Sequence, residues 1–236
     1  MRIGILQCDT VRAELQPAYG DYPDMFRRLL EPAVKGAEFR SWNLAAGARP
    51  GSAAACDAWL FTGSQYGVED GTAWIADAHR LVREIHNAGR PIVGICFGHQ
   101  LIANALGGRA GRADNGWGVG VHYVEVHTHA DWMTPALAQL RLPVSHRDQV
   151  HALPPGARHL AGSRFCPHAM FEIDDRVLAL QGHPEFRRGY VRALMDRRRE
   201  RLGEAVYRDG VASLAGDLDR GVVAGWIARF LERAAR

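Results

Sequence analysis

Short apolar runs alternate with amphipathic segments along the first hundred residues. Apolar runs at 3–8, where Gln7 is the one polar residue, 58–61 and 92–95 are typical of strands that are buried on both faces of a parallel sheet. A weaker run at 37–42 predicts a further strand. Between the runs, residues 74–85 place their apolar side chains at helical spacing, and a shorter helix is expected before residue 35. This alternation predicts an open parallel sheet with helices on both faces.

The second half of the chain has a different pattern. Residues 119–127 alternate between apolar and polar side chains, as expected for a strand with one exposed face. Further short apolar segments follow, with turn residues between them, at 142–145, 159–162, 169–173 and 177–181. Closely spaced strands predict an antiparallel extension of the main sheet. After the last of them the pattern is helical.

Together these patterns predict an α/β protein of three layers. We expect an α/β/α sandwich whose open, mostly parallel sheet carries an antiparallel extension. The chain has 236 residues, of which 47% are hydrophobic and 23% charged, so it is long enough to bury a substantial core. The sequence contains no internal repeat, and we expect residues 1–236 to form a single domain.

Composition narrows the classes of partner. The net charge of +3 gives no reason to expect a nucleic acid or a membrane as a partner. Cys8, Cys56, Cys96 and Cys166 are far apart and form no C-x-x-C pair, so we expect reduced thiols and no metal site. Because a strand begins directly after the first residues, without a signal peptide, we expect a cytoplasmic protein. The three arginines at 197–199 are interpreted as the solvated face of a helix.

One apolar run ends abruptly at a cysteine. Residues 92–95 lead into Cys96, glycines stand at positions 94 and 98, and a helical pattern follows at once. A nucleophile-type residue between spaced glycines, after a strand and before a helix, is typical of a nucleophile elbow. The turn exposes the side chain at the end of the strand, and the helix N-terminus beneath it favours a thiolate. We therefore predict that Cys96 is a nucleophile.

A thiolate nucleophile needs a base and a group that orients the base. His99 lies one helical turn beyond Cys96, where we expect it to point away from the thiol. His183 follows a strand and is expected at the sheet edge where the ligands of parallel sheets collect. Glu185 can hold its imidazole in one tautomer. A surface turn of His-Pro-Glu sequence is the alternative interpretation.

These segments together resemble the class I, triad-type glutamine amidotransferases. Residues 94–100 fit the pattern G-x-C-x-G-x-Q, and residues 183–185 supply a distant H-P-E. Thr-Gly-Ser at 62–64 stands where the family has a glycine-rich oxyanion loop, and residues 145–150 resemble its S-H-x-D-x-V segment. The likeness covers nearly the whole chain and is closest to stand-alone relatives of the GMP-synthetase glutaminase domain. It implies a flavodoxin-like sheet.

The resemblance implies roles for three groups of residues. Cys96 would be the nucleophile, His183 the general base and Glu185 the partner that orients it. The oxyanion hole would consist of backbone N–H groups of Gly63, Ser64 and Phe97. The amino-acid end of the substrate would contact Gln100 and the backbone around Ser145 and His146. Many members have two glycines in the oxyanion loop, so which N–H of the Gly63–Ser64 turn serves the oxyanion stays open.

The implied reaction is the cleavage of a γ-glutamyl amide through a cysteine thioester, without a metal or an organic cofactor. The sequence contains neither an S-G-G-x-D-S nucleotide loop nor a G-x-x-x-x-G-K-[ST] phosphate loop. We therefore expect a stand-alone hydrolase of glutamine or of another γ-glutamyl compound. The alternative is a glutaminase subunit that delivers ammonia to a separate ATP-dependent synthetase. The substrate is a small molecule in both cases, and a homodimer stays open.

Two further classes are weighed against this interpretation. The first is a thiol hydrolase of the intracellular-peptidase branch, in which a histidine usually follows the cysteine, whereas here Phe97 does. The second is a non-catalytic binding or regulatory protein, which would have no need to keep all three residues of the triad.

Tyr66 and Trp117 are expected to form flat walls for a bulky leaving group.

Overall fold

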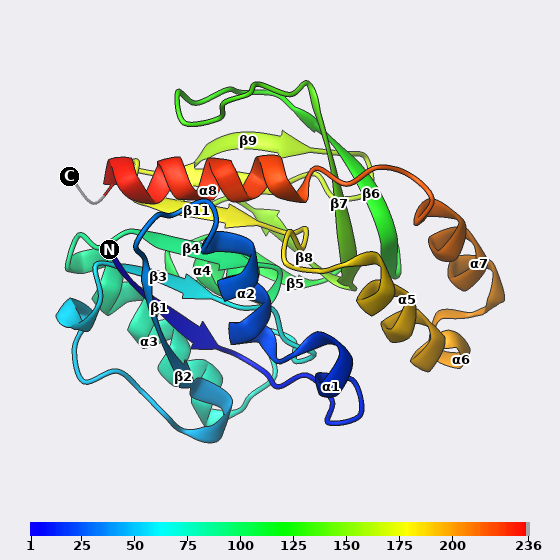
Figure 1. Cartoon of the computed structure of the whole chain (residues 1–236), viewed down its shortest axis with the longest axis horizontal. Coiled ribbons are helices and arrows are strands. Elements are labelled where there is room, and N and C mark those ends of the chain that lie inside the picture. Colours follow the sequence, from blue (N-terminus) through cyan, green and yellow to red (C-terminus); the bar gives the residue numbers. More distant parts are fainter. Residues whose placement is uncertain (235–236) are drawn as a thin grey trace.

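A nine-stranded sheet runs through the middle of the computed structural model, which describes residues 1–234 (Figure 1). Its strands lie in the order β2-β1-β3-β4-β11-β10-β9-β6-β7. Their bounds are β1 Arg2–Gln7, β2 Glu38–Asn43, β3 Ala58–Phe61, β4 Ile92–Ile95, β6 Gly118–Val126, β7 Gln139–His146, β9 Arg158–Gly162, β10 Met170–Ile173 and β11 Val177–Leu180.

The sheet has a parallel half and an antiparallel half. Strands β2, β1, β3, β4 and β11 pair in parallel, and the pairs from β11 through β10, β9 and β6 to β7 are antiparallel. In the register of β4 with β11, Ile95 lies opposite Leu180. The residues that follow these two strands therefore emerge side by side at one edge of the sheet. The predicted α/β fold with an antiparallel extension is confirmed.

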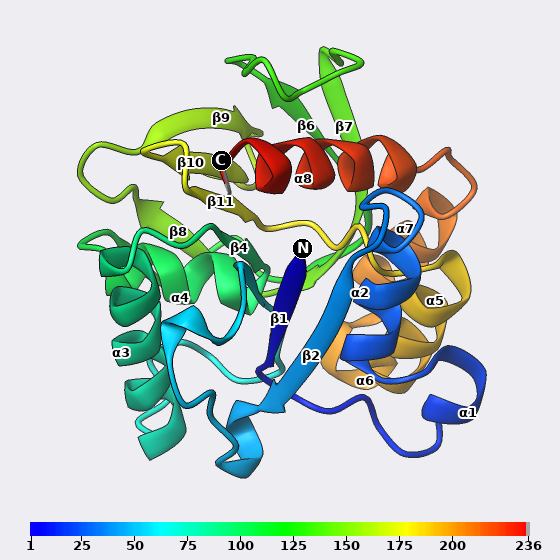
Figure 2. The same ribbon diagram turned by 60° about the vertical axis from the view of Figure 1, so that its left-hand side comes forward.

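Helices cover both faces of the sheet. Figure 2 shows α3 and α4 on one side and α2 and α8 on the other. Their bounds are α1 Gln16–Tyr19, α2 Tyr22–Leu30, α3 Ala73–Asn87, α4 Phe97–Ala105, α5 Arg188–Arg197, α6 Arg199–Leu202, α7 Glu204–Ser213 and α8 Arg220–Ala234. Among residues 1–234 there is no helix with the length and apolar character needed to cross a membrane.

Each face of the sheet contributes to its own apolar core. On one face, Phe26 of α2 and Phe230 of α8 pack in a cluster with strand residues such as Val93. On the other face, Phe61 belongs to a second cluster together with Leu101 of α4. Burying a large apolar side chain of this kind stabilises the fold by about 1.5–3 kcal/mol. These two layers fix the positions of β4 and α4, between which Cys96 lies.

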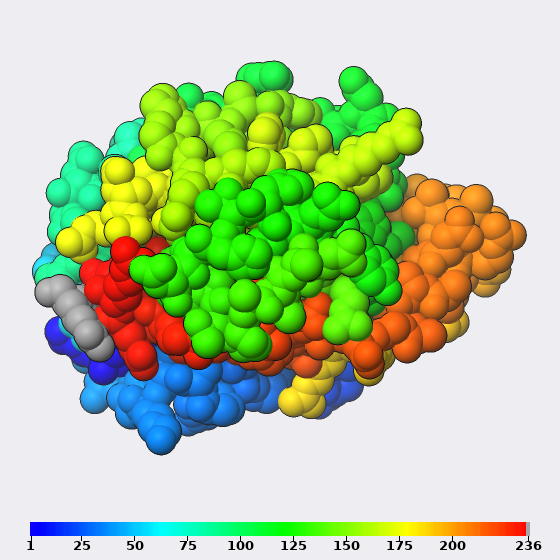
Figure 3. All heavy atoms as spheres, turned by 90° about the horizontal axis from the view of Figure 1, so that it is seen from above, coloured from blue at the N-terminus to red at the C-terminus, as the bar shows by residue number. Residues whose placement is uncertain are grey.

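The segment between β6 and β7 lies against α8. Figure 3 shows this segment (green) beside α8 (red). Trp132 contacts Phe230 edge-on, with 5.6 Å between ring centroids, and Trp226 Nε1 donates a hydrogen bond to the carbonyl of Pro135 at 3.0 Å. The antiparallel half is thereby joined to the helical layer.

Helices α5, α6 and α7 stand out at one end of the molecule (Figure 1). A third apolar cluster holds them in place, and in it Tyr190 and Val191 of α5 pack with Phe186 and with Val119 of β6. Because α5 begins at Arg188, shortly after Glu185, this cluster also anchors the chain just beyond the predicted triad.

A two-stranded sheet of β5 (Arg109–Arg112) and β8 (Asp148–Ala152) was not predicted. The sequence Arg-Ala-Gly-Arg of β5 has no apolar alternation that would indicate a strand. The strand is instead stabilised by antiparallel pairing with β8, in which Arg112 lies opposite Asp148. The segment that resembles S-H-x-D-x-V thus leads from the end of β7 into β8, and this fixes its direction.

Candidate active site

Cys96 lies between β4 and α4 in a strained backbone conformation. Its φ of 54° and ψ of −102° fall outside the regions that non-glycine residues normally occupy. Gly98 allows α4 to approach β3 closely after this turn, because a Cβ at that position would lie only 2.5 Å from the carbonyl oxygen of Phe61. The Gly98 N–H donates a hydrogen bond to the carbonyl of Thr62 at 3.2 Å. This is the strand–turn–helix geometry of a nucleophile elbow.

His183 and Glu185 form a buried hydrogen-bonded pair. Nδ1 of His183 lies 2.7 Å from Oε1 of Glu185, and both side chains are almost fully buried. Phe186 stacks on the imidazole with 3.8 Å between centroids and 5° between planes. Since Nδ1 faces Glu185, Nε2 is the nitrogen that remains for another partner.

Gly63 brings the two parts of the site together. A Cβ placed on Gly63 would lie 2.7 Å from Cε1 of His183 and 3.6 Å from Cβ of Cys96. The backbone at Gly63 therefore touches both the imidazole and the cysteine, and only glycine leaves room for the imidazole ring. The structure thus places Cys96, His183 and Glu185 close together around Gly63.

The electrostatics of His183 follow from its neighbours. Burial alone lowers the pKa of this imidazole, but the negative charges of Glu185 and Cys96 outweigh that effect and raise the pKa to about 10. A buried imidazolium between a carboxylate and a sulfur is therefore favoured at neutral pH. Such a group can give its proton to a leaving amine.

Other buried histidines have the opposite character. Burial lowers the pKa of His99 and of His146 to about 3, so both rings are neutral. His99 packs against Phe171 with 5.2 Å between ring centroids. No group of three or more His, Cys, Asp or Glu side chains in residues 1–234 is arranged to hold a metal ion.

Three backbone N–H groups next to Cys96 are free. Within residues 1–234, neither Gly63, Ser64 nor Phe97 has a hydrogen-bond acceptor for its N–H. Phe97 and Gly63 are buried, and Ser64 is half-buried. Buried N–H groups without a partner are rare because they cost free energy, so these donors are available to an anionic group on a ligand.

A chain of amides connects the site to β8. Gln100 donates from Nε2 to the carbonyl of Asp148 at 2.7 Å and to Oε1 of Gln181 at 3.0 Å. Gln181 lies 3.5 Å from the sulfur of Cys96 through its own Nε2. Sequence reasoning missed Gln181, although its place directly after β11 could have signalled it. His146 contacts the same carbonyl as Gln100, since its Nδ1 lies 3.1 Å from the carbonyl oxygen of Asp148.

Cys96 opens into a cavity of about 200 Å³. Its walls include the predicted substrate residues Gln100, Ser145 and His146. Ser64 lines it as well. The expected flat walls are also present, since the cavity is lined by the two aromatic side chains Tyr66 and Trp117.

The family to which this chain belongs follows from a comparison with known proteins. The family model described as "Glutamine amidotransferase class-I" matches residues 56–195, which is more than half of the chain and includes every predicted site residue. The chain belongs to the class-I glutamine amidotransferases. The predicted family is thereby confirmed.

Individual relatives of this amidotransferase carry several names. Gamma-glutamyl peptidase 4 of Arabidopsis thaliana is 30% identical over 76% of this chain and 73% of its own length. Gamma-glutamyl peptidase 3 of the same plant is 29% identical over 60% of this chain, and the match spans 59% of that relative. The glutamine-hydrolyzing GMP synthase of Aeropyrum pernix is 33% identical over 53% of this chain and 25% of its own length.

Solved structures share the fold of this amidotransferase. The crystal structure of a glutamine amido transferase from Methylobacillus flagellatus has a TM-score of 0.78 at 17% identity, and the match covers 99% of this chain and 94% of that chain. This likeness confirms the predicted layered sandwich.

The arginines at 197–199 agree only in part with the prediction of a solvated helix face. Arg197 and Arg198 line the Cys96 cavity, whereas Arg199 points to Glu204 in an exposed ion pair of 2.8 Å. Arg197 is still exposed on α5, as that interpretation expects, whereas Arg198 is half-buried because α5 ends here and the chain turns back beside Trp117. No local sequence signal reports that turn.

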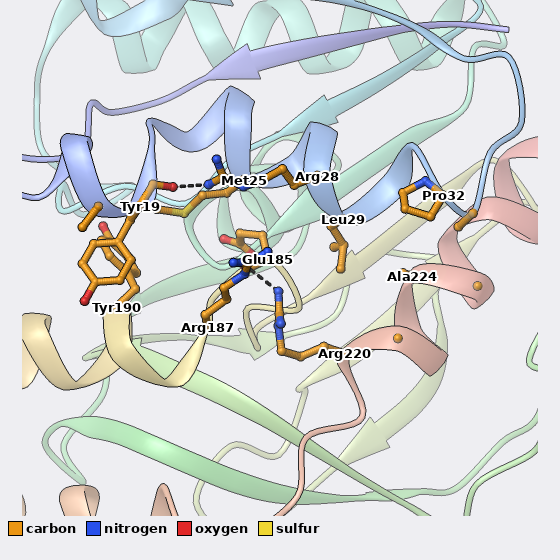
Figure 4. A pocket seen from close by; sticks show the side chains of 14 residues that line it. Tyr19, Met25, Arg28, Leu29, Pro32, Glu185, Arg187, Tyr190, Arg220 and Ala224 are labelled. Atoms are coloured by element: carbon orange, nitrogen blue, oxygen red, sulfur yellow. Dashed lines mark hydrogen bonds between the residues drawn. The ribbon is translucent and has the colours of Figure 1, made fainter.

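A second, larger cavity of the amidotransferase is lined by Glu185 but by neither Cys96 nor His183. It has a volume of about 580 Å³ and lies between α2, α5 and α8 (Figure 4). At its edge Arg220 donates from Nε to the carbonyl of Pro184 at 2.7 Å and from Nη2 to that of Glu185 at 3.2 Å. Arg220 thus holds the backbone of the H-P-E segment from behind.

Proposed function

We propose that this amidotransferase hydrolyses a γ-glutamyl amide bond through a thioester on Cys96. One observation carries the proposal. A cysteine on a strained elbow adjoins an imidazole paired with a carboxylate, and free N–H groups lie beside it. A nucleophile, a base with its orienting group and an oxyanion site are the parts that acyl transfer requires.

In the first half of the reaction the thiolate of Cys96 attacks the γ-carbonyl carbon. The carbonyl oxygen becomes negatively charged and is stabilised by the N–H of Phe97 together with an N–H of the Gly63–Ser64 turn, each donor contributing about 3–4 kcal/mol. The tetrahedral intermediate collapses as the carbon–nitrogen bond breaks. His183, as imidazolium, gives its proton to the leaving nitrogen, so that ammonia or an amine departs and a thioester remains.

In the second half, water attacks the thioester. His183 is now neutral and takes a proton from the water, whose oxygen bonds to the thioester carbon. A second oxyanion forms at the same N–H groups. Collapse releases glutamate and returns the sulfur of Cys96 as thiolate beside the imidazolium. Glu185 keeps Nδ1 of the imidazole protonated in both halves, so that Nε2 does the proton transfer.

We propose further that the substrate is a γ-glutamyl compound larger than glutamine and that the chain acts alone. The names of the Arabidopsis thaliana relatives support this choice. The cavity supports it as well, because Tyr66 and Trp117 line it together with Cys96. We also propose that residues 1–236 act as one domain, since strands from both halves of the chain share one sheet.

Steady-state kinetics on the purified chain test the proposal. The expected result is release of glutamate from γ-glutamyl dipeptides with a higher kcat/KM than from glutamine. Rapid quenching should trap a γ-glutamyl adduct on the peptide that contains Cys96, detected by mass spectrometry. Absence of turnover on every γ-glutamyl compound, restored only by an ATP-dependent partner protein, would instead identify a glutaminase subunit.

A further inference from the structure

The cavity of Cys96 is rich in positive charge. Six arginines line it, and Asp148 is the only carboxylate among its lining residues. The arginines come from the loop after β1, from β5, from the turn between β7 and β8 and from the region of α5 and α6: Arg12, Arg112, Arg147, Arg197, Arg198 and Arg201. They converge on one concave surface from distant parts of the chain.

Most of this charge is not neutralised by the protein. Arg112 pairs with Asp148 at 2.6 Å, and Arg197 pairs with Glu14 at 2.7 Å. In the part of the chain that the structure describes, the four other arginines of the cavity form no ion pair with a carboxylate. A cleft lined by one sign of charge concentrates the field and attracts ligands of the opposite sign.

Two of these guanidinium groups are held in place. Arg198 donates from Nη1 to Oγ of Ser145 at 2.8 Å, and its Cζ lies 5.7 Å from the ring centroid of Trp117. Arg201 lies over the same ring, with its Cζ at 4.9 Å. Cation–π contacts of this kind orient a guanidinium while leaving its N–H donors free for an anion.

The charge exceeds what the glutamyl part of the substrate can use. A γ-glutamyl group has one α-carboxylate and one α-ammonium, so its net charge is zero. One guanidinium is sufficient for that carboxylate, and further cations would repel the ammonium. The remaining arginines are therefore suited to bind negative charge on the leaving group, on the other side of the scissile bond.

We infer that the leaving group of the natural substrate is an amino acid or peptide with at least one free carboxylate, which Arg198 and Arg201 bind. This inference rests on the function proposed above. Guanidinium and carboxylate pair through two parallel hydrogen bonds, which gives direction as well as affinity. A cavity of about 200 Å³ has room for a group of amino-acid size beside Cys96.

Matched substrates test the inference. γ-Glutamylglycine and γ-glutamylglycinamide differ only in the charge of the leaving group, and γ-glutamylaspartate adds a second carboxylate. We expect kcat/KM to be at least about tenfold higher for the glycine than for the glycinamide, which is the worth of one charge-assisted contact. The aspartate compound should be as good or better. Raising the ionic strength to about 1 M, where the Debye length is about 3 Å, should reduce the difference.

Variants assign the preference to residues. Arg198→Gln and Arg201→Gln should each lower the ratio of kcat/KM between γ-glutamylglycine and γ-glutamylglycinamide several-fold. Arg208→Gln is the control, because Arg208 is exposed on α7 and does not line the cavity. Calorimetric titration of the Cys96→Ala protein should likewise show tighter binding of the glycine than of the glycinamide.

The outcomes separate this inference from the proposed function. Equal cleavage of charged and uncharged substrates would overturn the inference and leave the hydrolase intact. No cleavage of any substrate would overturn the function instead. The γ-glutamyl amide of phosphoethanolamine distinguishes the kind of anion, and a kcat/KM above that of both carboxylates would contradict an amino-acid leaving group.

Discussion

The two sides of the Cys96 site are built in different ways. On one side, Cys96, His183 and Glu185 are 3%, 3% and 2% exposed and lie just beyond the ends of the neighbouring parallel strands β4 and β11. On the other side, exposed arginines such as Arg12 and Arg201 come from loops and short helices. The first side is fixed by the packed core, and the second is assembled at the surface.

This difference assigns separate tasks to the two sides. Acyl transfer needs atoms held within a few tenths of an ångström, and strand ends in a buried sheet provide that precision. Recognition of a charged leaving group needs positive charge in the right region, which arginines at the surface provide. Changes on the buried side should therefore lower the rates of all substrates alike. Changes on the arginine side should alter which substrate is preferred.

The largest effects are expected for the nucleophile and the base. Cys96→Ala and His183→Ala should each lower kcat by more than about 10⁴-fold for every γ-glutamyl substrate, because neither the thioester nor the proton transfer can form. Steady-state assays with glutamine and γ-glutamyl dipeptides measure this loss, and circular dichroism checks that the fold persists. A variant that lost activity on one substrate alone would contradict the division into two sides.

The sequence predicted the buried side because its signals are local. The strand, turn and helix around Cys96 are contiguous, and His183 and Glu185 are two residues apart. The arginine side could not be predicted, since Arg198 meets Trp117 only after α5 ends and the chain turns back. The helical pattern before that point continues smoothly, so three successive arginines look like a solvated surface.

A smaller loss is expected when the orienting carboxylate is removed. Glu185→Gln keeps the shape of the side chain but removes its charge, and kcat should fall by about 10²–10⁴-fold. The reduction should be similar for charged and uncharged leaving groups. Steady-state assays with γ-glutamylglycine and γ-glutamylglycinamide measure it. A loss confined to one of these two substrates would show that Glu185 also contributes to recognition.

The same variant should change the pH dependence of stability. The folded protein raises the pKa of His183 from 6.5 to about 10 and therefore binds this proton more tightly than the unfolded chain. The resulting stabilisation is complete below about pH 6.5 and is lost as the pH rises towards about 10. Glu185→Gln should thus lose less stability than the parent between about pH 6 and about pH 9. Urea unfolding at both values measures the free energies, and equal losses would contradict the ion pair.

Gly63 should be intolerant of even one methyl group. A Cβ at this position would lie 2.7 Å from Cε1 of His183, so Gly63→Ala must displace the imidazole or the N–H groups of the turn. We expect kcat to fall by about 10²–10³-fold, comparable to the loss of one oxyanion donor. Ser64→Ala is the control, because it keeps the backbone N–H and should change kcat little. A large effect of Ser64→Ala would assign a role to the hydroxyl instead.

The smallest effect on the buried side is expected at Arg220. Its guanidinium donates hydrogen bonds to the carbonyls of Pro184 and Glu185, and it lines the larger cavity behind them. Arg220→Met keeps most of the length of the side chain but loses these donors, so the H-P-E segment should become less well positioned. We expect a decrease in kcat of roughly fivefold, about 1 kcal/mol, for all substrates, because the catalytic groups themselves remain.

Arg187→Met is the matched control for Arg220, because Arg187 lines the same cavity. We expect it to leave kcat unchanged. The Arg220 variant should also keep the ratio of kcat/KM between γ-glutamylglycine and γ-glutamylglycinamide, since this guanidinium does not line the Cys96 cavity. A changed ratio would mean that the buried side and the arginine side of the Cys96 site do not act separately. An unchanged ratio with a lower kcat would show that Arg220 of α8 belongs to the buried side of the site.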